Sequence, residues 1–319
     1  MTEHPELLPG LAAGQTPTIR VEHVSKWYGD VVAVSDISFG IAPGVTGLLG
    51  PNGAGKSTCL KMLSGLLAPS TGTITVDGQA VRGNPQVYRR LGLVGEQEHI
   101  YPFLTGREFV RWNAVMQRLP DPDGATDRAI SLVDMAEPAQ RKIAGYSKGM
   151  RQRIKVAAAL VHDPSVVLLD EPLNGTDPVQ RAALIDLMHR LGAEGRTVVV
   201  SSHVLSEVER FAQNILVIVN GKLAAAGDFH AIRSRMDQHP HTVAIRASDP
   251  RRLAGLLIAH PATSAVRFDE DQRLIAETAD IRTFSAALPV LARDADVHLH
   301  EVWPVDESLA SVFSYLVGR

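Results

Sequence analysis

Residues 50–58 combine the residue types that hold a phosphate group. They read Gly50-Pro51-Asn52-Gly53-Ala54-Gly55-Lys56-Ser57-Thr58 and match the phosphate-binding pattern G-x-x-x-x-G-K-[ST]. The glycines let backbone amides turn inward around an anion, Lys56 can reach terminal phosphates, and the Ser57 hydroxyl can ligate Mg2+. The apolar run 45–49 predicts a strand before the loop, and residues 59–67 predict a helix after it. This context distinguishes a phosphate-binding loop from an ordinary glycine-rich turn.

Two adjacent carboxylates end another apolar run. Asp170 and Glu171 follow residues 166–169, whose continuous apolar character is typical of a parallel strand covered on both faces. Because ligands gather at the carboxyl ends of such strands, we predict that Asp170 faces Mg2+ and Glu171 faces the attacking water. The segment alone would also fit a strand followed by a solvated turn, but that alternative loses weight beside the phosphate-binding loop.

Two further side chains fall where they can contact a nucleotide. His203 follows the apolar stretch 197–201, and a histidine at that sheet edge can reach a terminal phosphate. Taken alone, such a histidine is more often a polar surface residue. Tyr28 lies in the glycine turn at 26–29, where it can stack on a purine ring or pack on its own sheet. The local sequence leaves both readings of Tyr28 open.

Residues 146–153 predict a helix with an unfavourable start. Ser147 is a good N-cap, but Lys148, Arg151 and Arg153 place positive charge at the positive end of the helix dipole. Gly149 lowers helix propensity in the same turn. This arrangement fits a helix tip on which an anion docks, and it equally fits a solvated basic first turn.

The composition bounds the class of protein. The chain has 319 residues, enough for one large and one small domain, and its 32 basic and 35 acidic residues give a net charge of −3, so the charge balance does not point to nucleic acid. Its single cysteine, Cys59, fits a reducing compartment, and we expect a small buried side chain there. No apolar stretch approaches the ~18 residues of a membrane helix. We therefore expect a polypeptide that serves a membrane only through a partner.

The order of patterns along the chain predicts three regions. Residues 1–17 have the composition of a disordered leader, and residues 18–235 form the main domain, with a helix-dominated stretch at about 99–163. In that stretch, a capping box at Thr105 predicts a helix that runs to about Leu119, and a second helix is predicted from Thr126 to Met135. From 236 to 319 the order is strand, helix, strand, strand, helix, strand, which is the ferredoxin-like arrangement, with a closing helix at 307–317. This last region has no cluster of histidines or carboxylates at catalytic spacing, so we interpret it as a regulatory or docking module.

Together, these motifs resemble the ATP-binding cassette (ABC) transporter ATPases. The resemblance covers about residues 18–235, and the stretch 146–152 looks like the family's signature motif. It implies an α/β fold: a P-loop NTPase cassette with a mixed-sheet core and an inserted helical subdomain. The region 236–319 looks like the α+β extension of drug, polysaccharide and antibiotic exporter cassettes. The implied activity is ATP hydrolysis that powers export through separate membrane permease subunits.

The resemblance also implies an assembly and a set of binding residues. Two copies, or this chain and a second cassette, would sandwich ATP head to tail on the inner face of the cell membrane, in the cytoplasm, without nucleic acid. By matching position, Tyr28 stacks on adenine, Glu171 is the general base, and His203 and Lys56 contact the γ-phosphate. Mg2+ is assigned to Ser57, Asp170 and Glu96. The implied nucleotide-binding residues are Tyr28, Gly50, Pro51, Asn52, Gly53, Ala54, Gly55, Lys56, Ser57, Thr58, Glu96, Ser147, Gly149 and Asp177.

Three departures from the family pattern affect these assignments. The signature has Lys148 and Met150 in place of the usual glycine and glutamine, which leaves phosphate contacts to Ser147 and Gly149. Glu96 stands where a glutamine is usual, beside Gln97, so the side chain that senses Mg2+ stays open. Thr176 replaces a leucine in the loop containing Asp177. This loop is expected to cross the dimer interface, and Asp177 is the predicted N-cap of the helix that follows it.

Two other functional classes compete with the exporter ATPase. One is a soluble ABC ATPase of translation or DNA repair, but the two cassettes in one chain or the long coiled-coil insertion usual there are not visible in this sequence. The other is an ATP-switched binding module that does not hydrolyse ATP. The presence of Lys56, Asp170, Glu171 and His203 together argues against that class.

Overall fold

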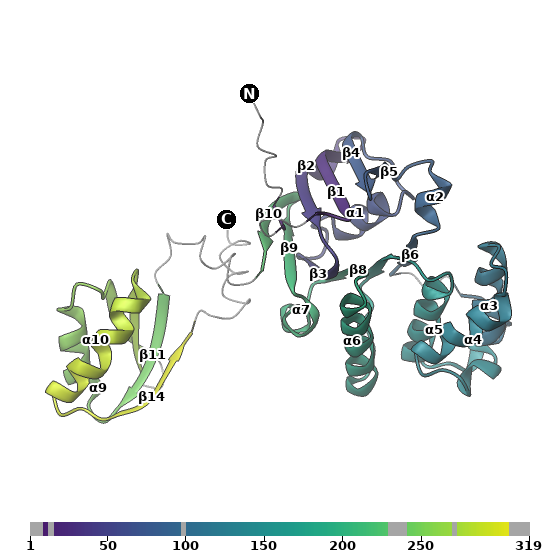
Figure 1. The fold of residues 1–319 in the computed structure, drawn as a ribbon. Helices are drawn as coiled ribbons and strands as arrows, with labels where there is room; N and C mark the ends of the chain where they lie inside the picture. Colours follow the sequence, from purple (N-terminus) through teal and green to yellow (C-terminus); the bar gives the residue numbers. More distant parts are fainter. Residues whose placement is uncertain (1–8, 12–15, 97–99, 229–240, 270–272, 306–319) are drawn as a thin grey trace. The chain divides into compact units, whose positions relative to one another are not determined.

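The computed structural model describes residues 9–11, 16–96, 100–228, 241–269 and 273–305 (Figure 1). The chain divides into two compact units, Met1–Phe229 and His230–Arg319. Among the residues that the structure describes, none of the helices has the length and apolar character needed to cross a membrane.

A largely parallel sheet forms the centre of the first unit. Its strands read as apolar runs because helices cover both faces, and Val166, Val167 and Leu168 are fully buried. The edge strand β10 pairs antiparallel with β9, while the other pairings are parallel. The spatial order is β10 (Lys222–Gly227), β9 (Asn214–Val219), β3 (Gly44–Leu49), β8 (Thr197–Ser202), β7 (Val166–Asp170) and β6 (Leu91–Val94).

An antiparallel sheet lies over the first helix. Helix α1 (Lys56–Leu63) packs between this sheet and the parallel sheet, and side chains of all three share one core that includes Phe39, Leu60 and Leu168. On the other face of the parallel sheet, α6 (Pro178–Ala193) and α7 (Leu205–Phe211) contact β3 and β8. The antiparallel sheet has the order β2 (Val31–Ile41), β1 (Ile19–Tyr28), β4 (Thr71–Val76) and β5 (Gln79–Ala80).

A group of helices lies beside β6 (Figure 1). The capping box expected at Thr105 is present, since Thr105 and Glu108 exchange backbone and side-chain hydrogen bonds at the start of α3. Arg107 and Arg111 of α3 pair with Asp123 of α4. The group consists of α3 (Gly106–Met116), α4 (Pro122–Leu132), short 3-10 turns at Pro138–Gln140 and Ile143–Gly145, and α5 (Lys148–Leu160), with the short α2 (Pro85–Tyr88) preceding β6.

The second unit has the element order expected from its sequence. A sheet with the order β12 (Ala265–Phe268), β13 (Leu274–Thr278), β11 (His241–Ala247) and β14 (Leu299–Pro304) is antiparallel throughout. Helices α9 (Pro250–Ile258) and α10 (Ile281–Asp294) share a core with it around Ile245, Leu253 and Phe284. The closing helix predicted at 307–317 lies outside the described residues.

Several predicted boundaries differ from the observed ones. Helix α1 begins at Lys56 and ends at Leu63, whereas we predicted 59–67, because Gly65 adopts a left-handed φ of 76°. The helix predicted from Thr126 is α4, which begins at Pro122 behind an Asp121 cap. Within the predicted leader, the Pro9 carbonyl accepts a hydrogen bond from the Gly40 amide at 2.9 Å, so this part of the leader contacts β2.

Candidate functional site

The loop between β3 and α1 has the geometry of a phosphate cradle. Gly53 and Gly55 take φ values of 78° and 105°, which side chains with a Cβ rarely adopt. Gly55 is the N-cap of α1 and supplies no side-chain cap, so the first amides of this helix face the loop at its positive end. A pocket of about 320 Å³ opens there. It is lined by Ala33, Asn52, Gly53, Gly55, Lys56, Ser57, Thr58, Glu96 and Glu171.

Lys56 is folded back into this pocket. Its side chain is 6% exposed, and Nζ donates to the Gly50 carbonyl at 2.8 Å and the Pro51 carbonyl at 3.2 Å. The same nitrogen lies 3.5 Å from Glu171 Oε1. The lysine of the phosphate loop and the carboxylate at the end of β7 therefore meet inside one pocket.

Ser201 organises the two carboxylates. Asp170 is 4% exposed and accepts a hydrogen bond from Ser201 Oγ at 2.7 Å, while the Glu171 amide donates to the same Oγ at 2.9 Å. Glu171 takes a left-handed φ of 48°, a strained conformation for a non-glycine residue. Sequence reasoning missed Ser201. The available signal was its place at the end of β8, beside Asp170 in the parallel register.

His203 completes the cluster at this edge of the sheet. Its Nδ1 lies 2.9 Å from Glu171 Oε2, so Lys56 and His203 contact the two oxygens of one carboxylate. Behind it, Ser202 Oγ donates to the buried Glu207 at 3.0 Å, and the other Glu207 oxygen lies 3.5 Å from Arg181 Nε. Glu207 and Arg181 are a second pair that the sequence did not reveal. They join the start of α6 to the segment carrying His203.

The helix tip at Ser147 has the cap that the sequence predicted. Ser147 Oγ accepts a hydrogen bond from the Met150 amide at 3.2 Å, and α5 begins at Lys148. Two of the cations have structural roles, since Arg151 donates to the Tyr146 carbonyl and Arg153 to the Asp134 carbonyl. The basic first turn is therefore used partly for packing. Neither Ser147 nor Gly149 lines the pocket at the phosphate loop.

Asp177 and Thr176 act locally in the loop before α6. Asp177 is the N-cap of α6 and accepts from the Gln180 amide at 2.8 Å. Thr176, which departs from the family pattern, is buried, and its hydroxyl donates to the Leu173 carbonyl at 2.7 Å. A buried polar side chain is tolerated when its hydrogen bond is made, so this replacement has a structural account.

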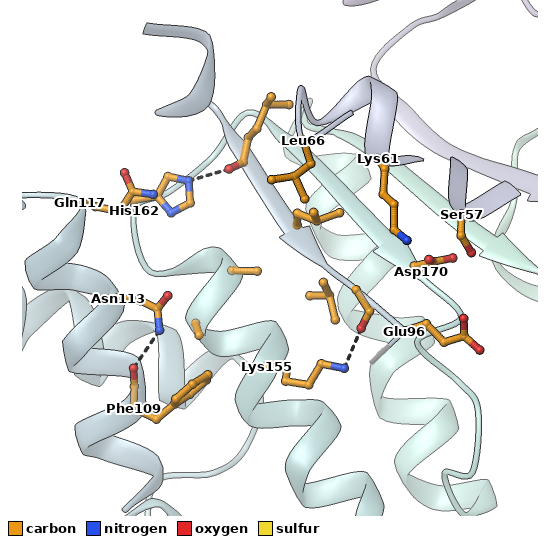
Figure 2. A pocket seen from close by; sticks show the side chains of 16 residues that line it. Ser57, Lys61, Leu66, Glu96, Phe109, Asn113, Gln117, Lys155, His162 and Asp170 are labelled. Atoms are coloured by element: carbon orange, nitrogen blue, oxygen red, sulfur yellow. Dashed lines mark hydrogen bonds between the residues drawn. The ribbon is translucent and has the colours of Figure 1, made fainter. Parts of the chain in front are cut away.

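A second pocket of about 410 Å³ opens on the other side of Glu96 (Figure 2). Ser57 and Glu96 line both this pocket and the one at the phosphate loop, and Asp170 reaches the second pocket from β7. The hydroxyl of Ser57 and the carboxylates of Asp170 and Glu96 are hard oxygen donors of the kind that Mg2+ prefers. The donor set therefore fits the ion assigned to it. Gln97, the alternative to Glu96, lies outside the described residues.

Tyr28 ends β1 with half of its side chain exposed, 49%. Lys26 Nζ lies 5.2 Å from the centre of its ring, and Tyr28 pairs with Val31 across the hairpin. The ring is therefore half exposed at the end of the strand, and both alternatives, stacking on a purine and packing on its own sheet, stay open.

Cys59 behaves as expected for a small buried side chain. It is 1% exposed behind the phosphate loop, and burial raises the pKa of its thiol to about 12. The thiolate form is therefore negligible at neutral pH, which makes Cys59 unsuited to nucleophilic chemistry.

The fold and this cluster define a P-loop nucleotide hydrolase, and comparisons with known proteins narrow the class. The model of the ABC transporter family matches residues 34–174. The linearmycin resistance ATP-binding protein LnrL of Bacillus subtilis is 35% identical over 68% of this chain and 71% of its own length. The bacitracin transport ATP-binding protein BcrA of Bacillus licheniformis is 29% identical over 94% of this chain and 97% of its own.

Solved structures agree with these sequence matches. An ATP-binding subunit of an ABC transporter superposes with a TM-score of 0.63 at 28% identity, covering 69% of this chain and 93% of that one. An ATP-binding cassette solved as a dimer with ADP and phosphate has a TM-score of 0.61 at 23% identity, covering 66% and 98%, and supports the fold alone. The chain belongs to the ABC transporter ATP-binding proteins. It is the ATP-hydrolysing subunit of such a transporter, as the sequence motifs predicted.

Proposed function

We propose that two copies of this chain, or this chain and a second cassette, sandwich two ATP molecules head to tail. Each nucleotide would lie between the phosphate loop of one copy and the Ser147-Gly149 helix tip of the other. The proposal rests on one observation: within one chain, no residue of the first turn of α5 lines the pocket at Lys56. The phosphate loop and the helix tip therefore do not share one pocket in a single copy. A cassette of the same fold has been solved as a dimer, which is the kind of assembly proposed for this chain.

Within this pocket, the side chains take distinct roles. Loop amides and Lys56 hold the β- and γ-phosphates, Tyr28 stacks on the adenine, and His203 contacts the γ-phosphate. Glu171 accepts the proton of the attacking water, and its contacts with Lys56 and His203 keep the carboxylate beside the phosphate site. Asp177, exposed at the start of α6, belongs to the surface that faces the partner copy.

Mg2+ fits at the junction of the two pockets. Ser57, Glu96 and Asp170, the last through water, would hold it. When bound, the ion neutralises charge on the β- and γ-phosphate oxygens. Ser201 fixes one oxygen of Asp170, which leaves the other oxygen available to the ion's water shell.

Membrane permease subunits would dock on the groove beside Glu96. An aromatic cluster flanks it: Tyr101, Phe103 and Trp112 are 43%, 69% and 50% exposed, and Tyr101 contacts both other rings. Exposed aromatic clusters next to a groove are typical of protein interfaces. This docking would hold the chain at the inner face of the membrane, in the cytoplasm. The antibiotic-resistance and Nod factor export roles named for relatives support export as the direction of transport.

Replacing Glu171 tests this function. A Glu171→Gln protein keeps the shape of the side chain but cannot accept the proton, so it should bind ATP, form a dimer and turn over at least about 100-fold more slowly. Size-exclusion chromatography with light scattering and a phosphate-release assay measure both properties. Undiminished hydrolysis would remove Glu171 from the role of general base.

A further inference from the structure

Lys155 is a buried cation on the helix that carries the signature tip. Its side chain is 8% exposed, and Nζ donates to the Gly95 carbonyl at 2.7 Å (Figure 2). Nζ also donates to Gln152 Oε1 at 3.3 Å. Burying an ammonium group is costly unless its protons find acceptors. The bond from Lys155 to Gly95 is therefore a specific attachment of α5 to the segment that follows β6.

The acceptor of this bond lies next to the proposed metal site. Gly95 directly precedes Glu96, and Glu96 lines both the phosphate pocket and the groove that Lys155 lines. Because the two residues share a peptide unit, a shift of the Gly95 carbonyl changes the position of Glu96 relative to Ser57. Lys155 thus contacts the backbone that supports Glu96 without itself lining the phosphate pocket.

The N-terminal tip of the same helix is the surface proposed to contact the partner's nucleotide. Ser147 caps α5, and Lys155 follows eight residues later, roughly 12 Å along the axis. The helix is continuous over this span, so a displacement of its tip is carried to Lys155. One rigid element therefore joins the surface proposed to touch the partner's ATP with the loop proposed to hold this chain's own Mg2+.

We propose that Lys155 is a positioning residue: through its bond to the Gly95 carbonyl, the position of α5 determines where Glu96 lies at the metal site. The inference rests on the proposed role of Glu96. It predicts that Lys155 affects nucleotide binding only when the divalent ion is present, because it acts through Glu96 and not through the phosphate loop.

His162 provides a matched comparison. Its ring Nε2 lies 3.0 Å from the Leu91 carbonyl, so it ties the residues just after α5 to the beginning of β6, whereas Lys155 ties α5 to the residue after β6 ends. Both side chains line the same groove (Figure 2). A role confined to packing α5 against β6 predicts similar effects for the two, while positioning of Glu96 predicts an effect for Lys155 alone.

The test measures ATP affinity by calorimetry in a Glu171→Gln background, with Mg2+ and with EDTA. In the Lys155→Met protein, the gain in affinity caused by Mg2+ should fall about tenfold, the effect of losing one charged hydrogen bond, while affinity in EDTA stays unchanged. His162→Gln should leave the gain intact, and Lys155→Arg should restore much of it. If the methionine variant does not fold, Lys155→Gln serves in its place.

Four results would overturn the inference. If Lys155→Met weakens ATP binding equally with Mg2+ and with EDTA, Lys155 has only a packing role. The same follows if His162→Gln loses as much of the Mg2+-dependent affinity as Lys155→Met does. If Mg2+ still raises the ATP affinity of Lys155→Met fully but no longer raises that of Glu96→Ala, the positioning role of Lys155 is refuted and the metal role of Glu96 stands. A full gain in Glu96→Ala would instead refute the proposed metal role of Glu96, so the two failures are distinguishable.

Discussion

The phosphate loop and the tip of α5 are both helix starts suited to an anion, but they are built differently. At the loop, Lys56 and His203 already contact the two carboxylate oxygens of Glu171, so three segments of the chain meet there. At the tip, Ser147 satisfies a single amide, and the nearby arginines contact backbone carbonyls. The first region holds its reactive groups in place by itself. The tip of α5 offers a helix start that can bind an anion, but it contributes no acid or base. A surface that only completes the site of another copy needs no more than this.

The largest effect should come from removing the positive charge of Lys56 at the phosphate loop. Lys56→Ala leaves the phosphates without their main cation and frees Glu171 from its 3.5 Å contact. We expect hydrolysis to fall at least about 1,000-fold. A phosphate-release assay measures this, with exposed Lys222→Ala as the control. Activity within tenfold of the unmodified protein would mean that the pocket at Lys56 is not the working site.

Ser201→Ala tests how Asp170 and Glu171 are held in place beside the phosphate loop. The change removes the donor to the buried Asp170 carboxylate and the acceptor of the partly buried Glu171 amide. Losing such bonds costs about 1–3 kcal/mol each, so kcat should fall about 10- to 100-fold. Exposed Ser206→Ala is the control. If kcat holds while the unfolding temperature drops, Ser201 serves stability alone.

A smaller effect is expected at the helices that support the tip. Thr105→Ala breaks the capping box of α3, which packs against α5. Loss of a cap costs about 1 kcal/mol, which corresponds to a drop of about 2–4 °C in Tm. Thermal unfolding followed by circular dichroism measures it, and Thr105→Ser should retain most of the stability. A drop as large in the serine variant would contradict the capping explanation.

The smallest expected effect is the reaction of the Cys59 thiol with an alkylating reagent in the folded protein. This buried thiol, with a pKa raised to about 12, should not react with iodoacetamide at pH 8 in the folded protein and should react after denaturation. Mass spectrometry distinguishes the two states. Rapid labelling of the native chain would show that the core behind the phosphate loop opens readily.

The sequence allowed prediction of features that are local in the chain. The strand-loop-helix around Lys56, the caps at Thr105, Ser147 and Asp177, and the strand and helix order of the second unit follow from residue spacing. The start of α1 was missed because the glycines of the loop give no helix signal, although Lys56 already lies in the helix.

Contacts between distant segments could not be predicted in this way. Ser201 reaches Asp170 only because β7 and β8 pair in one register, and Lys155 reaches Gly95 only because α5 packs beside β6. Neither serine nor lysine stands out in its own stretch of sequence. These residues connect the recognised motifs, and their roles follow from three-dimensional packing.

The central claim is that the tip of α5 binds a phosphate held by a second copy. Ser147→Asp tests it most directly, because aspartate caps a helix as well as serine does but places a negative charge where the phosphate should lie. In a Glu171→Gln background with Mg-ATP, sedimentation should give a dimer for Ser147→Asn and a monomer for Ser147→Asp, with ATP still bound to both. Equal dimer formation by the two variants would contradict the account.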